Sequence, residues 1–256
     1  MAGTRSLPES IWSELVGTVA VVDLESACEL YGVDLLPFPL GRSRPVGSVW
    51  LATRTVRPID VRLTDGDLQG VRAWVNALAQ PDVCVECRVH QFGEDTSDLG
   101  MHGLRSGGSA FVAVQGRDRD GVDTVDVYAV PPELWGEVVA ETVGLVGPGA
   151  HPRIAVTAAG QSSPDESDLD FLMPPADVTV PHVGANDVVA SGTVQVRRDV
   201  ARCWGTDPAL PILQWVQIRS DGDYVFDSGD AENAEPVDVE TLTAYLDEMI
   251  ADVTRW

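Results

Sequence analysis

The alternation of apolar and polar residues between positions 83 and 92 restricts the fold more than any other feature of this sequence. Every second residue from Val83 to Val89 is apolar or a cysteine, whereas Glu86, Arg88 and His90 occupy positions between and after them. Successive side chains of a β-strand point to opposite faces. The pattern therefore predicts a half-buried antiparallel strand, with one face in a core and one polar face.

Two turn signals extend this strand into a sheet. Asp120-Gly121 separates apolar runs over 109–115 and 124–130, and this dipeptide favours a tight hairpin because both residues tolerate positive φ. Later strands are expected over 193–198, 212–219 and 224–226, with Asp221-Gly222 turning the chain between the last two. A further strand is expected over 48–56.

Helical periodicity separates these runs of strands. Apolar residues at helical spacing predict helices over 23–31, 65–79, 131–146 and 238–253, and a shorter one over 9–16. Asp23 is expected to cap the first of these helices and Gly32 to end it. Because each set of antiparallel strands is followed by a covering helix, the fold class is α+β.

The chain is long enough for one sizeable core. We expect a single domain over residues 1–256, with an N-terminal half over about 18–150 and a C-terminal half over about 191–256. Residues 159–190 between them are acidic and rich in proline, which is typical of a long connection. An apolar island at 171–173 lies in this connection, and it is either a docking segment or a strap on the protein's own core.

The charge balance excludes some classes of partner. The sequence has 40 acidic and 17 basic side chains, a formal net charge of −23. Nucleic acid and anionic lipid would be repelled by such a surface, so neither is expected to bind. No apolar run approaches the length of a membrane span, and the N-terminus lacks a signal-peptide pattern, so we expect a cytoplasmic protein without membrane insertion.

The reactive side chains form no established catalytic or metal motif. Cys84 and Cys87 have redox spacing, but within a strand these positions face opposite sides, so two small packing residues are the better interpretation. The acidic residues around Asp118 lack the spacing of a calcium loop. No lysine is present to reach a phosphate. We therefore expect neither a metal nor a cofactor.

A long connection within the first set of strands is the best candidate for a binding element. Residues 92–101 exceed the usual length of a hairpin loop and carry three apolar side chains, Phe92, Leu99 and Met101. Long loops of this kind often bind partners, whereas the alternative is a flexible polar loop without a role.

Several strings, in order, resemble the EspG family, the cytosolic chaperones of type VII (ESX) secretion in actinobacteria. The opening segment 21–40 resembles the family's helix followed by a Leu-Pro-aromatic-Pro-Leu exit, and 78–83 its helix-to-strand junction. Residues 102–115 are similar to its Arg/Gly-rich turn and apolar strand, and 130–134 to the start of its next helix. The late strands 193–198 and 221–225 complete a resemblance over about residues 18–253. The family usually has helices where residues 159–190 are proline-rich.

The resemblance implies a mixed, mainly antiparallel central sheet in two quasi-symmetric halves covered by helices. It also implies binding rather than catalysis. The family holds newly made substrates, typically PE–PPE heterodimers, by the apolar tip of the PPE-type subunit, and delivers them to the export machine. The partner surface would comprise the central sheet, the loop 92–101 and the C-terminal helices. On this basis the candidate partner-binding residues are Phe92, Leu99, Met101, Arg105, Trp215 and Gln217.

Other functions remain open at this stage. A small-molecule or metal-dependent enzyme would need His90, His102, Asp98 and Cys87 to meet in one pocket. If the fold places them on opposite faces, this hypothesis fails. A third possibility is an interaction domain of the same fold without a role in export. Weak self-association is also possible.

Overall fold

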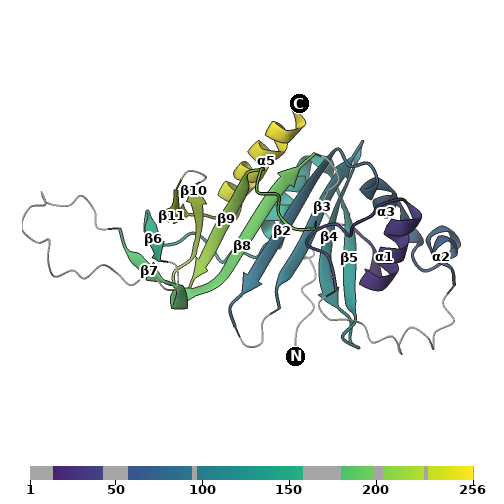
Figure 1. The fold of residues 1–256 in the computed structure, drawn as a ribbon. Coiled ribbons are helices and arrows are strands. Elements are labelled where there is room, and N and C mark those ends of the chain that lie inside the picture. Colours follow the sequence, from purple (N-terminus) through teal and green to yellow (C-terminus); the bar gives the residue numbers. More distant parts are fainter. Residues whose placement is uncertain are drawn as a thin grey trace, which may run out of the picture.

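The computed structural model describes residues 14–42, 57–93, 97–157, 180–198, 204–227 and 230–255. Within these ranges, 11 strands form one open sheet in the order β1-β5-β4-β3-β2-β8-β9-β10-β11-β6-β7, shown in Figure 1. Neighbouring strands are antiparallel, except that β6 and β7 are parallel. The predicted class, α+β with a mainly antiparallel central sheet, is confirmed.

The N-terminal half contains five strands. They are β1 (Glu14–Ala20), β2 (Val83–Gln91), β3 (Leu99–Ser106), β4 (Ser109–Arg117) and β5 (Asp123–Val130). Its helices are α1 (Val21–Leu30), α2 (Ile59–Asp65), the 3₁₀ turn η2 (Gln69–Val71), α3 (Arg72–Leu78), the 3₁₀ turn η3 (Pro132–Leu134) and α4 (Trp135–Thr142).

The C-terminal half contains six strands. Its strands are β6 (Ile154–Thr157), β7 (His182–Gly184), β8 (Val188–Arg197), β9 (Ile212–Ile218), β10 (Asp223–Asp227) and β11 (Asp230–Pro236). The 3₁₀ turn η4 (Ala185–Asp187) precedes β8, and α5 (Val239–Thr254) follows β11. The order β1-β5-β4-β3-β2 matches β6-β11-β10-β9-β8, and β2 and β8 pair at the centre.

The two faces of the sheet bury different cores. On the first, which we call the α4/α5 face, Val83, Val85, Cys87 and Val89 of β2 pack with Trp135 of α4 and Leu242 and Leu246 of α5. On the opposite one, the α1 face, residues of α1 and α3 such as Leu24 and Trp74 pack on β5 and β4 through Val127 and Ala113. A third, smaller cluster around Val216 and Tyr224 lies at the C-terminal half.

The predicted alternation of β2 is therefore confirmed, because its apolar positions enter the α4/α5 core. The exposed turns behave partly as expected. Gly32, with φ of 72°, ends α1, and Gly121, with φ of 76°, lies in the turn between β4 and β5. That turn is longer than a two-residue hairpin, since Asp118 Oδ1 accepts hydrogen bonds from the N–H groups of Asp120 and Val122.

Several helix boundaries differ from the prediction. The first helix begins at Val21, and its N-cap is Ala20, so Asp23 lies in the first turn and caps nothing. The helix predicted over 65–79 begins too early, because the helical segment formed by η2 and α3 starts at Gln69. The preceding helix α2, which ends at Asp65, was not predicted. Gly66 is extended there. The break is stabilised by Arg62, whose guanidinium pairs with Asp67 and with Asp23 of α1.

The helix predicted over 9–16 is also wrong where the structure describes it, since residues 14–16 belong to β1 and pair with β5. The strand predicted over 48–56 and the island at 171–173 lie outside the described residues. The C-terminal helix is confirmed. Asp238 caps it by accepting a 2.8 Å hydrogen bond from the N–H of Thr241. Five strands, β1, β3, β6, β7 and β11, were not predicted.

Candidate functional site

Polar residues occupy the α1 face of the two central strands. They are Glu86, Arg88 and His90 on β2 and Ser191, Thr193, Gln195 and Arg197 on β8. The same face is apolar a few strands away, where Ala113 of β4 and Val127 of β5 are fully buried. The change from apolar to polar occurs at His102 of β3, which pairs with Glu86. A polar stretch in the middle of an otherwise apolar sheet surface makes this face the candidate site.

Part of this stretch is buried as an ionic cluster. Glu86, His102, Gln195 and Arg197 are each less than a tenth exposed, and the Glu86 Oε2 and Arg197 Nη2 atoms are 2.7 Å apart. Burial raises the pKa of Glu86 to about 7 despite the nearby guanidinium, because desolvation penalises the carboxylate. Burial, reinforced by Arg197, lowers the pKa of His102 to about 3, so this imidazole is neutral. Its Nδ1 atom has no hydrogen-bond partner among the described residues.

The ionic cluster holds a connecting segment against the sheet. We call residues 204–211, which lead into β9, the strap. The side-chain amide of Gln195 donates to the carbonyl oxygens of Asp207 (2.8 Å) and Leu210 (3.3 Å) and accepts from the N–H of Asp207 (2.7 Å). Arg197 donates to the carbonyl oxygen of Gly205. Gln195 satisfies strap backbone groups as a neighbouring strand would.

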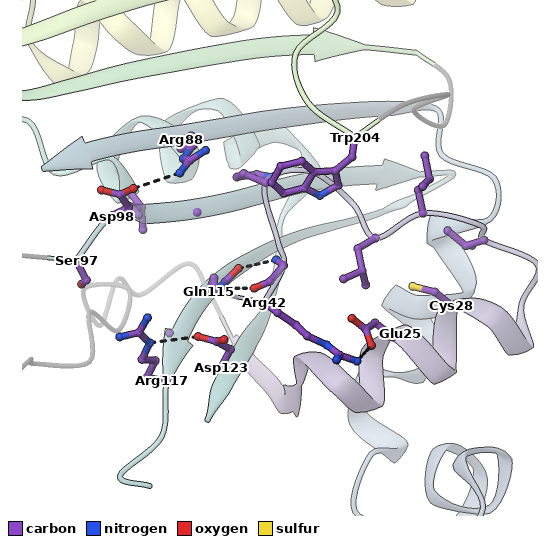
Figure 2. Close-up of a pocket in the computed structure, with 18 of the residues that line it drawn as sticks. Glu25, Cys28, Arg42, Arg88, Ser97, Asp98, Gln115, Arg117, Asp123 and Trp204 are labelled. Carbon is purple, nitrogen blue, oxygen red and sulfur yellow. Dashed lines mark hydrogen bonds and ion pairs between the residues drawn. The ribbon is translucent and has the colours of Figure 1, made fainter. Parts of the chain in front are cut away.

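A groove of about 1330 Å³ opens beside the strap, as Figure 2 shows. It is bounded by α1, by the segment 33–42 that follows α1, by the end of the β2–β3 connection and the start of β3 at 97–100, and by β4 and β5. The segment 33–42 is fixed to β4 because Gln115 makes two hydrogen bonds with the backbone of Gly41, of 2.8 and 2.7 Å. These bonds hold one wall of the groove in place.

Trp204 of the strap lines this groove and is 52% exposed. Its ring meets that of Phe38 edge-on, with the two centroids 5.0 Å apart at 87°. A Cβ atom on Gly41 would lie 3.4 Å from the indole, so glycine there allows the ring to lie close to the chain. One side of the indole is therefore packed on protein while much of the ring remains exposed.

Most charges in the groove are paired. Arg42 pairs with Glu25, Arg88 with Asp98 at 3.3 Å, and Arg117 with Asp123 at 3.2 Å, as the dashed lines in Figure 2 mark. Asp98 also lies 2.8 Å from Nδ1 of His90 and accepts from the N–H of Gln91. Asp98 therefore joins the end of the β2–β3 connection to the polar face of β2.

The β2–β3 connection is shorter than predicted. The loop expected over 92–101 ends at residue 98, because Leu99 pairs with Val89 and Met101 with Cys87 in the sheet. Leu99 and Met101 are buried in the α4/α5 core, so their expected place on an exposed loop is a correction. Phe92, in contrast, is 57% exposed directly after β2.

The other three predicted site residues lie on the α4/α5 face. The guanidinium of Arg105 lies 5.9 Å from the ring centroid of Trp135. Trp215 is 2% exposed, and Gln217 donates to the Asp223 carboxylate. The exposed Gln214, which precedes Trp215 and pairs with Thr193, lies on the polar α1 face instead. Because neighbouring residues of a strand point to opposite faces of the sheet, Trp215 enters the core while Gln214 faces the other side. Their role in binding stays a prediction.

Sequence reasoning missed Trp204, Arg88, Thr193 and Gln214. The signal for Gln214 was present, since alternation over 212–218 puts it opposite Trp215. Trp204 lies in a connection without periodicity, and the sequence carried no signal for it.

The constellation considered for an enzyme is not assembled. Cys87 points into the α4/α5 core, whereas His90 and His102 lie on the α1 face. Of the four residues, His90 and Asp98 meet. The described residues include no group of three or more His, Cys, Asp or Glu side chains arranged to hold a metal ion. Cys84 and Cys87 face opposite cores, as predicted. Desolvation raises the pKa of both thiols, that of Cys84 to about 12, so neither is a reactive thiolate.

Comparisons with known proteins add one positive finding. A protein-family model described as the EspG family matches residues 21–248. A search of curated proteins finds no match. Among the described helices, none is both long and apolar enough to cross a membrane.

Proposed function

Because the chain belongs to the EspG family, whose members are ESX secretion-associated chaperones, we propose that it binds the apolar tip of a PE/PPE-like helical substrate on the α1 face. Bound in this way, the substrate is kept soluble and delivered for export. A chaperone that covers an apolar surface stabilises the soluble form by mass action. The protein acts in the cytoplasm, as a stoichiometric binder without turnover and without a cofactor.

The observation that carries this proposal is the groove beside the central strands, with an exposed aromatic residue on its rim. Trp204 lines the groove, and the end of the β2–β3 connection with the start of β3, at 97–100, forms another wall. Phe92, at the start of that connection, is also exposed. Exposed aromatic residues next to a concave polar surface are typical of protein interfaces.

The proposed contact surface keeps only part of the predicted set. Phe92 remains in it because its ring is accessible, and Gln214 replaces Trp215 and Gln217, which face the other side of the sheet. Release at the export machine requires a modest interface rather than an obligate one.

Co-expression tests the proposal directly. The chain is produced with each PE/PPE-like pair encoded beside its gene, and the complex is analysed by size exclusion with light scattering. We expect a stoichiometric complex with one pair, and weaker binding by Phe92→Asp. The matched control is Val61→Asp on α2, where an exposed apolar side chain is changed in the same way. If no encoded pair co-elutes with the wild-type chain, the proposal is wrong.

A further inference from the structure

The indole of Trp204 packs on other residues of its own chain. Phe38, which is itself 6% exposed, packs edge-on against the indole, and Gly41 lies directly beneath it. The backbone on which Trp204 sits is fixed by Gln195 and Arg197 through the strap. An aromatic side chain that is already ordered loses little conformational entropy on binding, which is the property of an interface anchor.

The charges around this anchor are unbalanced. Three arginines in the groove are each paired with a carboxylate. Glu29 at the end of α1 and Asp34 after it also line the groove. Both are exposed, and neither has an ion-pair partner among the described residues. The groove therefore combines one exposed indole with two uncompensated carboxylates, in a chain of net charge −23.

These features specify the chemistry of the occupant. We infer that the groove binds a segment of the partner that places an apolar side chain on Trp204 and a Lys or Arg beside Glu29 and Asp34. Gln195 and Arg197 act as positioning residues for the indole. The inference rests on the proposed function, because the partner is the helical substrate named there. An acidic segment would be repelled by both carboxylates.

The two contributions differ in how they respond to salt. Removing an interface anchor typically costs enough to weaken binding by roughly 30-fold or more. Exposed charge pairs contribute less, so reversing one carboxylate should weaken binding by about 3- to 10-fold, mainly through a slower association rate. The electrostatic part is screened at high ionic strength, whereas the contact with the indole is not.

The test uses the PE/PPE-like pair that co-purifies with the wild-type chain. Its affinity is measured by titration calorimetry and biolayer interferometry at low and high NaCl. We expect Trp204→Ala to weaken binding by at least ~30-fold at both salt concentrations and Trp204→Phe to restore part of it. Glu29→Lys and Asp34→Lys should weaken binding and flatten its salt dependence. The controls are Val61→Ala and Glu137→Lys, the latter an exposed carboxylate on α4.

A double-mutant cycle tests the positioning residues. Gln195→Ala should lose nearly as much affinity as Trp204→Ala, and the double variant should lose little more, because both remove the same anchor. Thermal unfolding of each variant shows whether it is folded. If Gln195→Ala does not fold, the affinities of the Trp204 variants alone test the anchor.

Each result has one reading. Wild-type binding that is unchanged in Trp204→Ala overturns the inference and leaves the proposed function intact. Tighter binding by Asp34→Lys would show an acidic occupant and would also overturn it. A change in self-association, but not in substrate binding, would assign the groove to a second copy of the chain, against the inference. Absence of binding by the wild-type chain overturns the proposed function instead.

Discussion

The stability of this protein should depend on pH through two buried groups that oppose each other. Glu86 of β2 pairs with His102 of β3. On its other side Glu86 faces Gln195 and Arg197 of β8, and Cys84 lies two residues before it on β2. Desolvation raises the pKa of Glu86 from 4.5 to about 7 and lowers that of His102 from 6.5 to about 3. Folding therefore favours a bound proton on Glu86 and the loss of one from His102.

The sign of each contribution follows from linkage. Glu86 has a raised pKa in the folded state, so its contribution is fully present below pH 4.5 and is lost as the pH rises toward 7. His102 has a lowered pKa, so its contribution is present above pH 6.5 and is lost as the pH falls toward 3. Between pH 4.5 and 6.5 the folded state holds the Glu86 proton and the unfolded state the His102 proton, so the two slopes nearly cancel.

The substitution Glu86→Gln removes the contribution of Glu86 to the pH dependence of the unfolding free energy. With pKa values of 4.5 unfolded and about 7 folded, the Glu86 contribution falls by roughly 2 kcal/mol between pH 5 and pH 7. The unfolding free energy of Glu86→Gln should therefore rise by about that amount relative to wild type over the same interval. Taking the difference between variant and wild type removes the contribution of the other carboxylates.

Urea unfolding followed by tryptophan fluorescence, repeated from pH 5 to pH 7, measures this difference. His102→Leu is the complementary variant, and its stability should rise relative to wild type as the pH falls from 6.5 to 5. Parallel pH profiles for wild type and Glu86→Gln would refute the reasoning, because they would mean that Glu86 titrates alike in both states. A relative change of opposite sign would mean that Arg197 outweighs desolvation.

Three further predictions follow from the packing. Gly192→Ala should destabilise the fold by about 2 kcal/mol or more, because its Cβ would lie 2.0 Å from the Trp215 ring, whereas Gly108→Ala, with open space around it, should stay near neutral in the same urea titration. Asp223→Ala should cost roughly 2 kcal/mol by urea titration, because the carboxylate accepts hydrogen bonds from the N–H groups of Val146 (2.6 Å) and Gly147 (3.0 Å). Iodoacetamide should not label Cys28, Cys84 or Cys87 until urea unfolds the chain, because all three thiols are buried and burial raises their pKa values. Peptide mass mapping measures the labelling, and labelling of Cys87 in the folded chain would contradict its burial.

Three of the four strands of the central meander, β2, β4 and β5, were predictable because local patterning determines them, whereas β3 was not. Alternation over 83–92 set both the existence of β2 and the face that it buries, and α5 was identified by its apolar stripe and its Asp238 cap. Both signals act within a few residues of the chain. Where tertiary contacts decide the outcome, prediction failed. The helix predicted from residue 65 starts at Gln69, because the chain is extended at Gly66, and the separate helix α2, which Arg62 joins to Asp23 of α1, was not predicted.

The candidate site was predictable only in outline. The sequence marked the β2–β3 connection, but it carried no information on where strand pairing resumes, so Leu99 and Met101 were assigned to the loop rather than to β3. Trp204 acquires its position from Gln195 and Phe38, which are 9 and 166 residues away in the chain. Contacts at such separations leave no periodic trace in the sequence.

The internal symmetry of the fold explains why the two faces differ. In each half a helix follows the last meander strand, α4 after β5 and α5 after β11, and both helices enclose the same core. The opposite face is not matched in this way. In the N-terminal half the chain between β1 and β2 supplies α1, α2 and α3, which bury a large apolar cluster, whereas the described part of the equivalent connection in the C-terminal half supplies β7 and η4.

This asymmetry places the polar central strands at the border between a helix-covered region and a smaller core. Apolar residues such as Ala113 are favourable where a helix packs on them, and polar ones where water or a partner does. The sequence of β2 and β8 follows this rule, since Arg88 and Thr193 pair across the centre and are both half-buried. We propose that such a surface, partly polar and flanked by the indole of Trp204, binds an apolar tip reversibly, because a chaperone that delivers its substrate must also release it.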